Sequence, residues 1–152
     1  MLSAIRNFFE NNLSSSAESE SAREHQLRVA TAALLIEMML QDEQAMRQEK
    51  QAVLSALQQR FKLTSAETDE LYQLAEDERL NATDYHQFTN LIAKHFTQPQ
   101  KIQIIDNLWS VAYADGELDK YEEHMVRRIA DLIHVSHRDF LQTKHRYESQ
   151  GR

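Results

Sequence analysis

The stretch that decides the fold is ADGELDKYEE, residues 114–123. It contains Gly116, the only glycine before the C-terminal tail, and a lone glycine in a helix-rich chain typically marks a backbone position with positive φ. Apolar residues recur at helical spacing on both sides: Ile102, Ile105, Leu108, Trp109 and Ala112 before the stretch, and Met125, Val126, Ile129, Leu132 and Ile133 after it. The pattern predicts two amphipathic helices joined by an acidic turn, with Asp119 as N-cap and Glu122 as its capping-box partner.

The same turn matches the second half of a calcium-binding EF-hand loop. Asp115 precedes the glycine and Glu122 stands where the closing glutamate of the loop would stand. The first half is missing, because Val111 and Tyr113 occupy the two early ligand positions and neither offers a carboxylate. A complete EF-hand is therefore excluded, and an ion at this turn needs further oxygen ligands from elsewhere in the chain.

Composition limits the class of protein. The chain has 152 residues, 41% of them hydrophobic, which is enough for one domain with a core, and two glycines and one proline argue against a sheet protein with many turns. The absence of cysteine removes disulfides and thiolate sites and fits a reducing compartment. A net charge of −7 argues against nucleic acid and anionic membrane as main partners. With no transmembrane run and no secretory signal, the sequence predicts a cytoplasmic protein.

The N-terminal segment, residues 1–21, is predicted to be distinct from the folded domain, residues 22–149. Leu2, Ile5, Phe8 and Phe9 lie on one face of a short amphipathic helix, and a Ser/Glu-rich linker follows. Two interpretations are open for this helix. It packs on the domain or frays as a terminal helix, or it serves as a peripheral anchor at the inner face of the membrane or as a handle for a partner.

The predicted fold class is all-α, with about seven helices in one globular domain besides the N-terminal helix. Capping signals at Thr64, Thr97 and Ser136 mark the starts of three of them. The first four expected helices cover about 22–40, 46–61, 65–76 and 84–96. Three more begin after Thr97, Asp119 and Ser136.

An internal repeat relates the two halves of the domain. Placing Asp42 on Asp115 also places Glu49 on Glu122, and the segment 61–64 aligns with 133–136 after one residue of slippage. The repeat predicts two pseudo-symmetric helical units with an acidic turn in each. The first turn is degraded, since Glu43 stands at the glycine position.

These residues resemble the tellurite-resistance TerB-like family over about residues 24–147. The most specific segments are LWSVAYADGELD at 108–119, EEH at 122–124 and RRIADL at 127–132, with support from AALLIEM at 32–38 and YHQFTNLI at 85–92. The resemblance implies an all-helical domain without established enzymatic activity, whose relatives occur in metal-stress and envelope contexts beside membrane-associated protein partners.

The resemblance also implies a divalent-cation site in the acidic turns. Its residues here are Asp115, Asp119, Glu122 and Glu123, with Asp42 and Glu49 in the other half. Hard carboxylate oxygens favour Ca²⁺ or Mg²⁺. The resulting hypothesis is a non-enzymatic module that binds a cation and docks to proteins; the alternative is a metal-dependent enzyme that uses the Asp115 and Glu122 carboxylates. Neither the partner nor the oligomeric state follows from the sequence.

A competing interpretation explains the same acids without an ion. Asp119 and Glu122 act as helix caps, while Asp115 and Glu123 pair with Arg127 or Arg128. The aromatic residues Trp109 and Tyr113, on the helix leading into the turn, are either core or, where exposed, an anchor for a docked protein.

Overall fold

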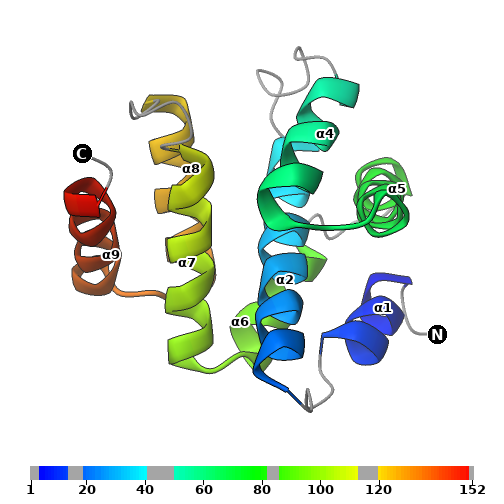
Figure 1. Cartoon of the computed structure of the whole chain (residues 1–152). Helices are drawn as coiled ribbons and strands as arrows, with labels where there is room; N and C mark the ends of the chain where they lie inside the picture. Colours follow the sequence, from blue (N-terminus) through cyan, green and yellow to red (C-terminus); the bar gives the residue numbers. More distant parts are fainter. Residues whose placement is uncertain (1–3, 14–18, 41–49, 82–85, 113–119, 151–152) are drawn as a thin grey trace. The chain divides into compact units, whose positions relative to one another are not determined.

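The structure is a computed structural model that describes residues 4–13, 19–40, 50–81, 86–112 and 120–150, without the side chains of 50, 53, 120–122 and 147–150. Figure 1 shows that these ranges are helical throughout apart from short turns. The eight helices within them are α1 (Ala4–Asn12), α2 (Glu20–Leu40), α4 (Lys50–Phe61), α5 (Ser65–Asn81), α6 (Gln87–His95), α7 (Gln98–Ala112), α8 (Lys120–Leu132) and α9 (His137–Gln150). The predicted all-α class is confirmed.

The predicted capping signals define several helix starts. Thr64 Oγ1 accepts the backbone N–H of Glu67, and the Thr64 N–H donates to the Glu67 side chain at 2.9 Å, which is a complete capping box at the start of α5. Thr97 and Gln100 form the same reciprocal pair before α7. Ser136 Oγ accepts the N–H of Asp139 at 3.1 Å at the start of α9. Each pair satisfies backbone donors that have no partner within the helix.

Three helix boundaries differ from those predicted. α2 begins at Glu20 rather than Ala22, because Ser19 Oγ accepts the N–H of Ala22 and so caps the helix earlier. α5 continues to Asn81 rather than ending at Glu76, and α6 begins at Gln87 rather than Asp84.

Two turns that follow helices share one local geometry. Lys62 and His134 have φ of 55° and 67°, the left-handed conformation that commonly ends a helix. In each turn the next residue donates its N–H back across the helix end, Leu63 to the Gln58 carbonyl at 3.0 Å and Val135 to the Ala130 carbonyl at 2.8 Å. Both donors are buried apolar residues, so the two turns terminate α4 and α8 in the same way.

Two compact units make up the chain, Met1–Phe88 and Thr89–Arg152, and the boundary falls inside α6. In the first unit α2 packs against α4 and α5. In the second, α7 packs against α8 and α9, coloured from yellow-green to red in Figure 1. Each unit thus has one helix that contacts the two that follow it. The shared contact pattern and turn geometry are consistent with the predicted repeat, whose pseudo-symmetry stays a prediction, as do the domain limits 1–21 and 22–149.

The N-terminal helix α1 belongs to the core of the first unit. Its apolar residues Ile5, Phe8 and Phe9 are buried, and so is Leu13 just after it. The ring of Phe8 meets Phe88 edge-on, with centroids 6.0 Å apart. Of the two interpretations of this segment, packing on the domain is therefore the one observed, and these apolar side chains are not available to a membrane.

The core of the second unit is built around Trp109 on α7. Its side chain is fully buried, its ring lies 5.4 Å from that of Phe140 on α9, and its indole N–H donates to Thr143 Oγ1 at 3.0 Å. Trp109 is thus a core residue rather than a docking anchor, while Tyr113 lies outside the described residues. None of the described helices combines the length and apolar character needed to cross a bilayer.

Candidate functional site

Most of the predicted cation ligands lie outside the residues that the structure describes. Asp115 and Asp119 fall between the end of α7 and the start of α8, and Asp42 and Glu49 fall between α2 and α4. All four lie outside the described residues, as does the side chain of Glu122 within α8. The structure therefore places one predicted ligand side chain, that of Glu123.

Glu123 lies on the first turn of α8 and holds an ion pair with α9. Its Oε2 lies 2.7 Å from Nζ of Lys144. The sequence pairs Glu123 with Arg127 or Arg128, which are four and five residues along its own helix, but the partner comes from the next helix instead. Arg127 lies with its guanidinium carbon 5.5 Å from the centre of the Phe140 ring.

A second acid of this unit lies beside the same helix α9. Asp106 on α7 has Oδ1 at 3.7 Å from the guanidinium of Arg146. Burial raises the pKa of Asp106 above its ordinary value, and Arg146 only partly opposes this effect. Asp106 on α7 and Glu123 on α8 thus each face a basic residue of α9.

A metal-binding cluster is not formed by the side chains that the structure places: no three acidic or histidine residues among them converge as ligands would. The side chain of His124, a neighbour of Glu123, is exposed. The Glu123 carboxylate is a hard oxygen donor of the kind that Ca²⁺ and Mg²⁺ accept. In the structure it is paired with the Lys144 ammonium.

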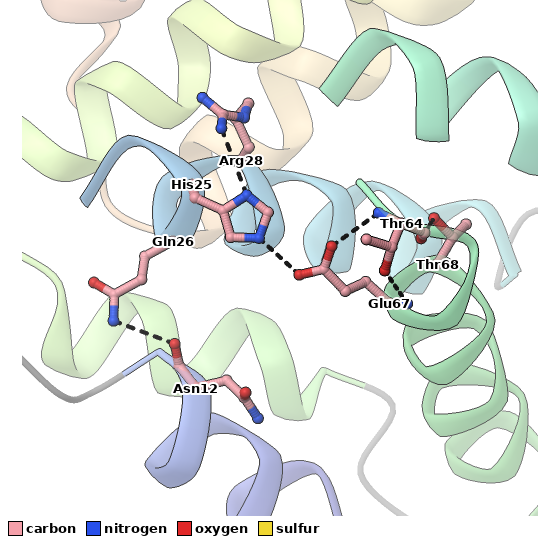
Figure 2. A network of polar contacts seen from close by, with 7 residues as sticks. All are labelled: Asn12, His25, Gln26, Arg28, Thr64, Glu67 and Thr68. Carbon is pink, nitrogen blue, oxygen red and sulfur yellow. Dashed lines mark hydrogen bonds and ion pairs between the residues drawn. The ribbon is translucent and has the colours of Figure 1, made fainter. Parts of the chain in front are cut away.

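A polar network of the first unit centres on Glu67 and is shown in Figure 2. One carboxylate oxygen of Glu67 accepts the Thr64 N–H, and the other lies 2.7 Å from Nε2 of His25 on α2. Burial raises the pKa of Glu67, but the hydrogen bonds and charge supplied by Thr64 and His25 outweigh it, so the pKa is lowered overall. This network joins α2 to the start of α5.

The network extends beyond Glu67 through the histidine ring. Nδ1 of His25 lies 3.5 Å from Nη2 of Arg28 on the same helix. Gln26 reaches from the same helix to the Asn12 carbonyl at the end of α1 (Figure 2). Since these groups bond helix ends to one another, we assign the network a structural role.

Comparison with known proteins decides the family. The model of the family described as tellurite resistance protein TerB matches residues 28–145, well over half of the chain. The chain belongs to the TerB family. Neither the search of curated proteins nor that of solved structures returns a match.

The TerB match includes both acidic turns, and α1 lies before its first residue. Two buried acids inside the matched region were not predicted from the sequence to have a specific role. Glu37 on α2 and Glu78 on α5 are 1% and 4% exposed, and their carboxylates accept the backbone N–H groups of Phe88 and Gln87 at the start of α6. No local pattern identifies such partners, because Phe88 lies 51 residues from Glu37.

Proposed function

We propose that this TerB chain is a non-enzymatic cytoplasmic module that binds a divalent cation, Ca²⁺ or Mg²⁺, through its acidic turns. The site comprises Asp115, Asp119, Glu122 and Glu123, with Asp42 and Glu49 as its counterpart. The family match supports the proposal, because the matched residues include both turns and the family is named for tellurite resistance.

The observation that supports the proposal is the cluster of acids around the second turn, of which Glu123 is the one whose side chain the structure places. This carboxylate is about a quarter exposed, lies on the first turn of α8 and faces the Lys144 ammonium at 2.7 Å. Six further acids occur within residues 106–131, four of them in 115–122, and clustered carboxylates repel one another unless a cation relieves the repulsion. Oxygen donors of this kind suit a hard divalent ion.

We propose further that the acidic turns dock this module to protein partners, some of them membrane-associated, in metal or envelope stress. The apolar face of α1 does not serve this purpose, since Ile5, Phe8 and Phe9 are buried in the first unit. We assign docking to the acidic turns, where cation binding would change the charge that is presented to a partner.

The test is thermal unfolding of the metal-stripped chain with and without Ca²⁺ or Mg²⁺. A ligand that binds only the folded state stabilises it by about 2.7 kcal/mol at a hundred times its dissociation constant. We expect a rise in Tm that the double variant Asp115→Asn, Glu122→Gln loses.

The matched control is Asp69→Asn, Glu70→Gln, which removes the same charge from two exposed positions of α5. It is expected to keep the full cation-dependent rise. An equal rise in both double variants, or no rise in the unaltered chain, contradicts the proposed site.

A further inference from the structure

The first turn of α7 contains an almost fully buried lysine. Lys101 is the fourth residue of this helix and is 6% exposed. The ion pairs formed within the described ranges involve other residues, so no described carboxylate neutralises the Lys101 ammonium. Lysine is rarely this buried without a partner, because burying an ammonium costs free energy unless an opposite charge compensates for it. The position therefore favours a negative charge that the described part of the chain does not supply.

The N-terminal end of α7 adds to the positive charge around this lysine. The helix dipole makes such an end partly positive, and an acidic side chain in the first turn would offset it, but the first turn of α7 has none. No Asp or Glu occurs anywhere in residues 85–105, although the chain has 24 of these acids. Lys101 thus lies where the dipole disfavours a cation, and no neighbour in sequence compensates for it.

Helix geometry directs the Lys101 side chain toward a backbone N–H at this end of α7. Side chains of a helix lean toward its N-terminus, so that of Lys101 lies over the turn that contains Thr97 and Gln98. The N–H groups of Thr97 and Gln100 are satisfied by each other's side chains, and that of Lys101 donates to the Thr97 carbonyl at 3.0 Å. Among the described residues, none accepts the N–H of Gln98, an exposed residue whose side chain donates to the His134 carbonyl at 3.2 Å.

We propose that Lys101 and the N-terminal end of α7 bind a phosphate group or a similar doubly charged oxyanion. The ammonium supplies the charge, while the Gln98 N–H and the helix dipole orient the ion. A lysine this buried reaches solvent with its ammonium end, where a small ion can meet it. The site is separate from the proposed cation site, because the acidic turn follows the opposite end of α7 in the sequence and takes the opposite charge.

The experiment is calorimetric titration of the full chain with inorganic phosphate at constant ionic strength. We expect saturable binding that Lys101→Met weakens about tenfold or more, because a charge-assisted contact is lost. The matched control is Lys94→Met, which removes the same charge from an exposed position in the last turn of α6. It should change the affinity by less than about twofold. Glycerol phosphate is the second probe: its binding shows a site that also takes phosphate esters, and binding of inorganic phosphate alone shows a site for the free ion.

A pair of variants at Gln98 tests the backbone N–H. Gln98→Pro removes this N–H at a helix position that accommodates proline, whereas Gln98→Ala keeps it and removes the side chain. Gln98→Pro should weaken phosphate binding by about threefold or more, and Gln98→Ala should leave it nearly unchanged.

Unfolding measurements show whether Lys101→Met folds. Without phosphate this variant should be at least as stable as the unaltered chain, because a buried charge without a counter-charge is gone. Phosphate should raise the Tm of the unaltered chain and not that of the variant. No saturable binding of inorganic phosphate by the unaltered chain, or equal binding by Lys101→Met, overturns the inference and leaves the lysine stem as a cover for the apolar core. Neither result affects the proposed cation site, which is tested with Ca²⁺ and Mg²⁺.

Discussion

The carboxylate of Glu37 accepts a hydrogen bond from the backbone N–H of Phe88 at 2.9 Å. Glu78 does the same for the adjacent Gln87 at 3.2 Å, so acids from α2 and α5 both bind the start of α6. The first N–H groups of a helix lack partners within it, and its N-terminal end attracts negative charge. These contacts explain how two glutamates are tolerated in the buried interior of the first unit.

Glu37→Ala is expected to lower the free energy of unfolding by about 2 kcal/mol or more, because it leaves a buried N–H without its acceptor. Glu37→Gln keeps an acceptor oxygen and should lose less. The measurement is urea-induced unfolding. The control is Glu70→Ala at an exposed position of α5, where a change within about 0.5 kcal/mol is expected. Equal effects at the two positions would contradict the assigned role of Glu37.

Phe9→Ala tests the packing of the N-terminal helix. Phe9 is 2% exposed, and truncating a buried phenylalanine typically costs about 3–5 kcal/mol. The control is Asn7→Ala on the exposed side of α1, which should leave stability nearly unchanged. Denaturant unfolding checks both variants. Unaltered stability in Phe9→Ala would show that α1 does not contribute to the core and is a detachable tether.

The lowered pKa of Glu67 predicts that the free energy of unfolding depends on pH. Its pKa in the folded chain lies below the ordinary value of 4.5, so its contribution is fully present above that value and is lost as the pH falls through the lower folded pKa. Glu67→Gln should therefore be less stable than the unaltered chain at pH 7, and the difference should narrow below about pH 4. Unfolding measured at pH 7, 5, 4 and 3 checks this. A difference that stays constant throughout would show that the charge of Glu67 is irrelevant.

Replacing either of the two residues with positive φ by glycine is expected to stabilise the chain. Lys62 and His134 both have positive φ, which costs a non-glycine residue roughly 1 kcal/mol. Lys62→Gly and His134→Gly should each raise the free energy of unfolding by up to about 1 kcal/mol. Lys62→Ala serves as the control and should give no such gain, because alanine keeps the steric conflict. Thermal unfolding distinguishes the cases, and a loss of stability in both glycine variants would refute the explanation.

The helix class and the caps were predictable because they depend on neighbours in sequence. Thr64 with Glu67, and Thr97 with Gln100, lie three residues apart and form the expected reciprocal bonds. Contacts between helices were not predictable in this way. His25 meets Glu67 across 42 residues, and no periodicity or spacing identifies that pair.

In the candidate site, too, local features were predictable from the sequence and contacts between helices were not. Spacing along α8 assigns Arg127 or Arg128 to Glu123, yet the observed partner is Lys144 on the following helix. The packing of α8 against α9 decides this pairing, and one sequence does not specify it. The acidic turns themselves were recognised from residue types alone, so their ligand roles remain predictions that need a direct measurement.

That measurement is calorimetric titration of the metal-stripped chain with Ca²⁺ and Mg²⁺, repeated on Asp115→Asn, Glu122→Gln. The account predicts saturable binding by the unaltered chain that the double variant loses and that Asp69→Asn, Glu70→Gln retains. No binding by the unaltered chain would contradict it, and would leave these carboxylates as helix caps and ion-pair partners.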